Sequence, residues 1–192
     1  INGTFADMRK SLYLDFDQPW WSQGFNEVVE YQGAQFCGLG AALLSQYRFA
    51  FVTLFNKDLF TEANQPFLYE AVENGSWTLD KQISLVPLFH QDNGNNKQDE
   101  EGDVYGFVSD IYISIDPYQT TAELEILRKN EDGDYEWAYD NERIHDVTEK
   151  VLRLYYETDD AMYIALPTDF QEDTRTIFSN DKAAMATLCL QA

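Results

Sequence analysis

Basic residues are scarce in this chain of 192 residues, which has 13 lysines and arginines against 34 aspartates and glutamates and a formal net charge of −21. Nucleic-acid binding needs lysine and arginine to replace the counterions of the phosphates, so nucleic acid is a poor candidate for a partner. An anionic membrane surface is equally unfavourable. Long apolar runs are also missing, and none approaches the roughly 20 residues that a transmembrane helix needs. We therefore expect no membrane span in this chain.

Cysteine and histidine are rare, with two of each. Cys37 and Cys189 are too few for a disulfide framework. Both lie in apolar, strand-like segments, where a free cysteine behaves as a small hydrophobic residue, so we expect two buried thiols, with a single bridge between them as the alternative. His90 and His145 lie far apart in the sequence, and no cysteine–histidine spacing typical of a metal site occurs.

The common motifs of catalysis are missing as well. The sequence has no G-x-S-x-G, no P-loop and no G-x-G-x-x-G, because Gly38-Leu-Gly40 lacks the third glycine. Acid pairs such as Asp15 and Asp17 are expected by chance among 34 acidic residues. A glycosidase needs two carboxylates at a set separation across a cleft, which a sequence does not show. We expect a protein without catalysis and without a cofactor.

What the chain does have is a composition typical of a folded protein, with 44% hydrophobic and 15% aromatic residues. Its length suits one domain or two small lobes. The most polar stretch, residues 91–103, predicts a surface loop with calcium-type oxygen ligands in Asp92, Asn93, Asn95, Asp99 and Asp103. Because their spacing does not match the EF-hand pattern, a solvated loop is the preferred interpretation and we expect no metal.

Capping residues and apolar periodicity predict helices near 66–74, 78–86, 141–157 and 169–179. The first of these has Asn64 as its expected cap and Pro66 in its first turn, and the second starts after Thr78 and is ended by Pro87. The expected caps of the third and fourth helices are Asp140 or Asn141, and Asp169. Apolar and β-branched runs predict strands over Arg48–Phe55, Val104–Ile115 and Met185–Leu190, and turn residues predict hairpins at 31–34 and 130–133. The expected fold is α/β or mixed α+β, with a mixed sheet flanked by helices.

Six segments carry a resemblance to a known family. They are Asp17–Gln23 (D-Q-P-W-W-S-Q), Tyr31–Phe36 (Y-Q-G-A-Q-F), Leu54–Leu59 (L-F-N-K-D-L), Asn74–Lys81 (N-G-S-W-T-L-D-K), the loop and strand Asp92–Phe107, and Asn141–Tyr156. In this order they resemble the extracellular solute-binding proteins of ABC importers, in the maltose-binding-like family 1. The chain departs from that pattern at Pro87, at Gln91, where an aspartate is usual, and in the loop Asn93-Gly-Asn-Asn96.

The resemblance implies a periplasmic-binding-protein-like fold of two lobes. Residues 46–192 would form most of the second lobe, and residues 1–45 would be the segment that leads out of the first lobe toward the hinge. Members of the family are longer, so the resemblance implies a partial chain.

The resemblance implies that the protein captures a sugar or oligosaccharide without chemistry and delivers it to an ABC permease. Closure of the two lobes over the ligand would be the signal to the permease. The full-length protein would be a lipid-anchored lipoprotein on the extracellular cell surface. Two alternatives stay open: a self-contained carbohydrate-binding or adhesion module, and a secreted glycoside hydrolase domain.

Candidate ligand-binding residues occur in three places. Trp20 and Trp21 face opposite sides of an extended segment, so one can stack on a sugar ring, unless both belong to the core or to a lobe interface. Phe36 is the next candidate, and after it Gly38 and Gly40 can let the backbone approach a ligand, unless they form a plain turn or bulge.

The third place is Asp110 with Tyr112, at a strand end that the resemblance implies to face the cleft. A carboxylate there accepts two hydroxyl donors, which suits a polyol, and the alternative is a strand-end turn. The combined hypothesis is that Trp20 or Trp21, the two glycines, and Asp110 with Tyr112 converge on one face.

Overall fold

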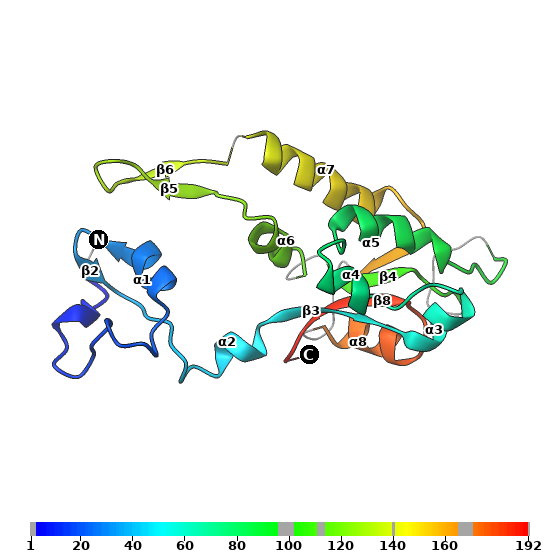
Figure 1. Cartoon of the computed structure of the whole chain (residues 1–192), viewed down its shortest axis with the longest axis horizontal. Helices are drawn as coiled ribbons and strands as arrows, with labels where there is room; N and C mark the ends of the chain where they lie inside the picture. The colour runs from blue at the N-terminus through cyan, green and yellow to red at the C-terminus, as the bar shows by residue number, and fades with distance from the viewer. Residues whose placement is uncertain (1–2, 96–101, 111–113, 140, 165–170, 192) are drawn as a thin grey trace. The chain divides into compact units, whose positions relative to one another are not determined.

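The computed structural model describes residues 3–95, 102–110, 114–139, 141–164 and 171–191. The chain divides into two compact units (Figure 1). The first unit contains the residues up to Ala50 together with Leu127–Trp137, and the second contains Phe51–Ile126 together with the residues from Ala138 onward. The boundary at residue 45 that the family resemblance implies stays a prediction.

The second unit is built on a four-stranded sheet. Its strands are β3 (Phe51–Phe55), β8 (Met185–Cys189), β4 (Phe107–Asp110) and β7 (Ala161–Ile164), in the order β3-β8-β4-β7. Strand β4 runs parallel to both of its neighbours, whereas β3 pairs with β8 in the antiparallel direction. The predicted α/β class with a mixed sheet is therefore confirmed at this level, and the sheet is mostly parallel.

Alternating side chains of this sheet supply two separate apolar clusters. Phe107 and Met185 belong to the cluster that includes α5 (Leu79–Leu85) and α7 (Glu142–Tyr156). Val108 and Ala186, one position further along each strand, belong to the cluster that includes α8 (Glu172–Ser179). Figure 1 shows α8 on the opposite side of the strands from α5 and α7. Both faces of the sheet are thus covered, as parallel strands require.

The described residues of the second unit form four further helical segments. They are α3 (Lys57–Glu62), α4 (Tyr69–Glu73), the 3-10 turn η2 (Val86–Leu88) and α6 (Asp116–Thr121). Among the described residues no helix is both long and apolar enough to cross a membrane.

The helix predictions based on capping residues are largely confirmed. The Thr78 hydroxyl accepts a hydrogen bond from the Lys81 N–H at 3.2 Å and begins α5, which ends at Leu85 before Pro87. Asn141 caps α7 through the Ile144 N–H. Helix α8 lies within the predicted range 169–179, although its expected cap Asp169 is outside the described residues.

The helix predicted over 66–74 is shorter, because α4 covers only Tyr69–Glu73. The expected cap was wrong for a local reason. Asn64 has a left-handed φ of 53° and its N–H donates to Thr61 O, so it closes α3 instead of opening α4.

Two strand predictions were too long. Ser45–Arg48 forms the short helix α2, so the strand predicted from Arg48 begins only at Phe51. The strand predicted over Val104–Ile115 is regular only over Phe107–Asp110, and α6 begins at Asp116. The start of the strand is limited by a close backbone contact, because a Cβ atom on Gly106 would lie 1.9 Å from the Val86 carbonyl oxygen.

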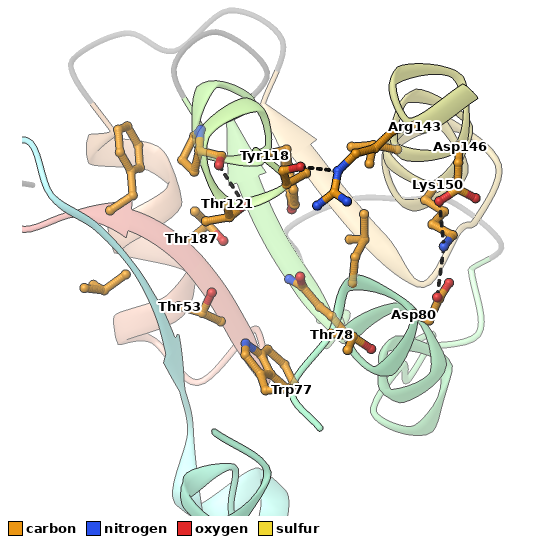
Figure 2. A pocket seen from close by; sticks show the side chains of 17 residues that line it. Thr53, Trp77, Thr78, Asp80, Tyr118, Thr121, Arg143, Asp146, Lys150 and Thr187 are labelled. Carbon is orange, nitrogen blue, oxygen red and sulfur yellow. Dashed lines mark hydrogen bonds and ion pairs between the residues drawn. The ribbon is translucent and has the colours of Figure 1, made fainter. Parts of the chain in front are cut away.

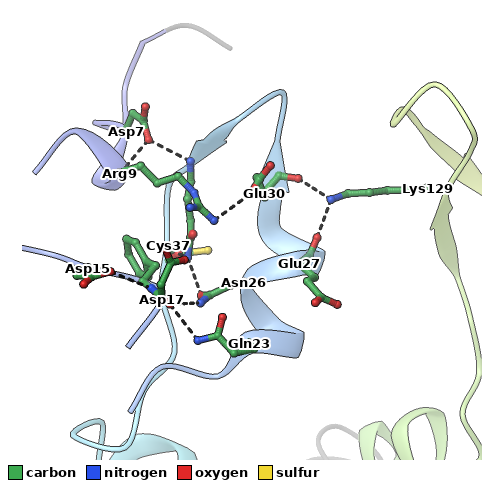
Figure 3. A network of polar contacts seen from close by, with 12 residues as sticks. Asp7, Arg9, Asp15, Asp17, Gln23, Asn26, Glu27, Glu30, Cys37 and Lys129 are labelled. Atoms are coloured by element: carbon green, nitrogen blue, oxygen red, sulfur yellow. Dashed lines mark hydrogen bonds and ion pairs between the residues drawn. The ribbon is translucent and has the colours of Figure 1, made fainter. Parts of the chain in front are cut away.

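The first unit contains η1 (Met8–Lys10), α1 (Gln23–Val29), β1 (Glu30–Tyr31), β2 (Ala34–Gln35) and the hairpin of β5 (Leu127–Lys129) and β6 (Tyr135–Trp137). Both predicted hairpins are confirmed, and Gly133 has the positive φ, 83°, that the second turn needs. The helical state of Val28 and Val29 was not predicted; Ser22 caps their helix. Lys129 Nζ donates to the carbonyl oxygens of Glu27 and Glu30 at 2.6 and 2.7 Å and so joins the second hairpin to α1 (Figure 3).

The close contact at Gly106 yields a first prediction. In Gly106→Ala the added methyl group overlaps the Val86 carbonyl, which belongs to the backbone and cannot rotate away, so we expect the free energy of unfolding to fall by about 3 kcal/mol, the upper end of the usual cost of overpacking. Gly75→Ala is the control, because Gly75 has a φ of 74° but open space around it, and we expect a loss of about 1–2 kcal/mol. Urea unfolding followed by circular dichroism measures both. Equal losses would contradict the contact.

Candidate functional site

A cavity of about 530 Å³ lies in the second unit, and all of its lining residues come from that unit. Thr53 and Thr187, which are paired directly across β3 and β8, contribute from the sheet. Trp77 and Thr78 contribute from the start of α5, and α6 and α7 supply the remaining walls. Figure 2 shows the two threonines across the open space from the α7 side chains.

The walls combine aromatic faces with short polar groups. Phe51, Trp77 and Tyr118 offer the aromatic surface. Thr53, Thr121 and Thr187 add hydroxyl groups, although the Thr121 hydroxyl already donates to Pro117 O at 2.8 Å. A cavity of this size and mixed lining is typical of sites for small organic molecules.

Gln82 is the most informative residue of the lining. The residue is only 6% exposed, yet its amide nitrogen Nε2 has no hydrogen-bond partner among the described residues. Leaving a buried polar group unpaired costs about 1–3 kcal/mol, so folded proteins rarely do so without a reason. The Gln82 amide is therefore a hydrogen-bond donor without a protein partner among the described residues, in the wall of the cavity.

The charged side chains of the lining balance one another. Lys150 Nζ lies 3.0 Å from both Asp80 Oδ2 and Asp146 Oδ2 and so joins α5 to α7 (Figure 2). The hydrogen bond with Asp80, followed by that with Asp146, raises the pKa of Lys150. Arg143 is the other cation, and its Nε donates to Ala122 O at 2.5 Å. With two acids and two bases, the lining carries no net charge and suits an uncharged ligand.

Burial keeps the nearby phenols neutral. It raises the pKa of Tyr118 well above its ordinary value, with a contribution from the adjacent Tyr155. Burial also raises the pKa of Tyr155 to about 12, and its hydroxyl donates to Ser109 Oγ at 3.1 Å. Near neutral pH both side chains are therefore uncharged and can act as hydrogen-bonding groups.

The tryptophan and glycine residues selected from the sequence lie in the first unit. Trp20 is 55% exposed, whereas the Trp21 ring packs on Phe16 with ring centroids 4.8 Å apart. A Cβ atom on Gly38 would lie 2.8 Å from the Phe16 ring, and one on Gly40 would lie 2.8 Å from the Trp21 ring. The two glycines therefore make room for these aromatic side chains. Phe36, just after β2, is half-buried.

Asp110 lies in the second unit and is only 1% exposed. Its Oδ2 accepts hydrogen bonds from Ser114 Oγ at 2.7 Å and from Gln171 Nε2 at 2.9 Å. The other end of the Gln171 amide accepts from the Cys189 N–H, so the carboxylate belongs to a network that links β4 to β8. Tyr112 is outside the described residues. The convergence of Asp110 with the tryptophans stays a prediction.

The predicted pair of buried thiols was correct for Cys189 and wrong for Cys37, which is exposed; both are free. The difference arises because β2 ends at Gln35, so the apolar run around Cys37 does not continue as a strand.

In the polar loop, Asp103 is buried and accepts from the Asn93 N–H at 3.0 Å and from the Tyr105 hydroxyl at 3.2 Å. Asp92 and Asn93 each accept from the N–H two residues later, at Gly94 and Asn95. No group of three or more metal-ligating side chains gathers in the described part of the chain, and Asp99 is outside it.

The sequence alone did not identify the cavity residues. Asn74–Lys81 was used only for the resemblance, although Trp77 directly before the helix cap Thr78 marks an aromatic side chain held at a fixed place. The sequence did not mark Gln82 as a candidate, because a glutamine in a short helix is usually exposed and its burial is visible only in the structure. Comparison of the chain with family models, with curated proteins and with solved structures finds no match.

A second prediction concerns Asp110. Asp110→Asn replaces a buried acceptor of two hydrogen bonds by a group that brings its own donors, so we expect a loss of about 1.5–3 kcal/mol in stability without any ligand. Asp116→Asn, an exposed change of the same charge at the start of α6, should cost less than about 1 kcal/mol. Thermal unfolding compares the two variants, and an Asp110→Asn protein of unchanged stability would disprove the structural role.

A third prediction concerns Asp7 in the first unit (Figure 3). The hydrogen bond from the Gln35 N–H, followed by that from the Arg9 N–H and the charge of Lys10, lowers the pKa of Asp7 below the ordinary 3.8. A lowered folded-state pKa gives stability that is present above the unfolded-state pKa and is lost as the pH falls through the folded-state pKa. Asp7→Asn should therefore destabilise the protein at neutral pH, and the difference should shrink in acid.

Thermal unfolding across the acid range tests this pH dependence, with Asp17→Asn as the control for the change in net charge. A destabilisation by Asp7→Asn that stays constant down to the most acidic condition would contradict the role of the ionised carboxylate.

Proposed function

We propose that this chain binds a small uncharged solute, a sugar or short oligosaccharide, and performs no chemistry on it. The observation that carries the proposal is the buried Gln82 amide with its unpaired Nε2 in the wall of the cavity. A ligand oxygen that accepts this hydrogen bond recovers the free energy lost by burying the donor alone.

The rest of the lining favours a sugar over other uncharged molecules. The C–H face of a sugar ring is apolar and stacks on aromatic rings such as those of Trp77 and Phe51. Its hydroxyl groups both donate and accept, which matches the threonine hydroxyls and the neutral phenol of Tyr118. A charged ligand would be repelled by the like-charged member of each ion pair in the lining, Lys150 with Asp80 and Lys150 with Asp146.

The transport context rests on the sequence segments that resemble ABC-importer solute-binding proteins. In that context residues 46–192 would form most of the second lobe, the partner would be an ABC permease, and the full-length protein would be lipid-anchored on the extracellular surface. The chain passes between the two units after Ala50, after Ile126 and after Trp137, and several crossings of this kind suit a hinge.

One observation favours the second candidate, a self-contained carbohydrate-binding module. All of the residues that line the cavity come from the second unit. A module of this kind binds its sugar with full affinity as the present chain, whereas a two-lobed receptor gains affinity from its other lobe. Calorimetry on this chain and on a longer natural form separates the two candidates.

The fourth prediction tests the site itself. Gln82→Leu keeps the size of the side chain but removes the donor, so we expect sugar affinity to fall about 3- to 10-fold. Because Nε2 has no partner among the described residues, the same change should not reduce the stability of the ligand-free protein. Isothermal titration calorimetry with glucose, galactose, mannose and maltose measures the affinity.

Gln91→Leu is the matched control, since Gln91 is exposed and does not line the cavity. Unchanged affinity in Gln82→Leu, or no binding of any of these sugars by the unmodified chain, would overturn the proposal. Loss of stability in Gln82→Leu would assign the amide a structural role instead.

A further inference from the structure

A second cavity, of about 440 Å³, lies between α6 and α7 in the second unit. Its lining is mostly apolar and includes Leu124, Ile126, Ile144, Val151 and Leu152. Asp116, Gln119 and Thr148 add polar groups, together with the hydroxyls of two tyrosines. The second cavity therefore suits an apolar group better than a sugar.

The two cavities share part of their walls. Tyr118 and Val147 line both of them, so the cavities are neighbours separated by these two side chains. Tyr118 suits this position because its ring offers an apolar surface to one side while its neutral hydroxyl can hydrogen-bond. The mixed first cavity and the apolar second cavity are thus adjacent, on either side of these two side chains of α6 and α7.

We propose that the ligand is amphiphilic: a glycoside whose sugar lies in the first cavity and whose aliphatic group lies in the second. This inference rests on the proposed function, because the sugar end is assigned by Gln82. The aliphatic end is assigned by the apolar lining of the second cavity and by its position next to the first cavity, with which it shares Tyr118 and Val147.

The rim of the second cavity supports an aliphatic occupant. Ile126, Tyr139 and Leu152 line the cavity and are also exposed on its surface. Covering such apolar surface is favourable in proportion to the area removed from water. A hydrocarbon chain that enters beside Tyr118 covers this surface and the cavity walls together.

The fifth prediction compares methyl and octyl glycosides of glucose, galactose and maltose, below their micelle concentrations, by isothermal titration calorimetry. We expect the octyl glycoside of the bound sugar to bind at least about 10-fold more tightly than the methyl glycoside, which is the effect of burying two methylene groups. Thr148→Trp fills the second cavity from an exposed position of α7 and should remove this gain without changing methyl glycoside affinity.

Glu149→Trp is the matched control, because Glu149 is the next exposed residue of α7 and lines neither cavity; it should keep the gain. Equal affinity for the methyl and octyl glycosides would overturn this inference and leave the proposed function intact. A gain that survives Thr148→Trp would place the aliphatic group elsewhere and also overturn it. If none of the glycosides binds, the proposed function fails and the inference fails with it.

Discussion

The close packing of the Gly106 backbone against the Val86 carbonyl is the constraint on which the second unit depends. A side chain at Gly106 would collide with that carbonyl at 1.9 Å. The Gly106 N–H donates to Asp160 O at 2.8 Å, and the neighbouring Tyr105 exchanges hydrogen bonds with Lys182 O and the Ala184 N–H. This short segment therefore ties the end of α5 to the starts of β4, β7 and β8. Because α5 is held against the sheet here, Trp77 and Gln82 keep their place over β3 and β8.

The first cavity follows from the sizes of the side chains along one strand pair. Phe55 and Met185 are directly opposite each other, and their bulk fills the core under α5. Two residues away on the same face, the opposed pair is Thr53 and Thr187. The small side chains of Thr53 and Thr187 leave the space of the first cavity, whereas the bulky side chains of Phe55 and Met185 fill the equivalent space at the other end of the strand pair. The ion pairs of Lys150 join α7 to α5 beside the cavity. The sheet thus has a filled end and an open end.

The sequence was sufficient where one residue determines local geometry. Thr78 and the pair Asp140-Asn141 predicted helix starts because a side-chain oxygen caps a free N–H, and Asn141 is the cap of α7. Asp132-Gly133 predicted a hairpin because glycine adopts positive φ. The sequence was insufficient where tertiary packing determines the structure. The short segment Ala161–Ile164 forms the strand β7 because it pairs with β4 in the parallel direction. The exposure of Cys37 and the packing roles of Gly38 and Gly40 likewise depend on neighbours that periodicity does not reveal. The cavity is harder still, because its lining comes from segments between residues 51 and 187.

Charge connects the composition to the proposed ligand. A net charge of −21 surrounds the molecule with a negative potential, which lowers the local concentration of anionic solutes. The same potential attracts cations to the whole surface, so it does not by itself direct a cation to the cavity. Inside the cavity, however, Lys150 is shared by two carboxylates and Arg143 is engaged with a backbone carbonyl, so the local charges cancel. With an acidic exterior around a neutral cavity, selection of the proposed ligand would rest on hydrogen bonds and stacking, which are the interactions that distinguish one uncharged polyol from another.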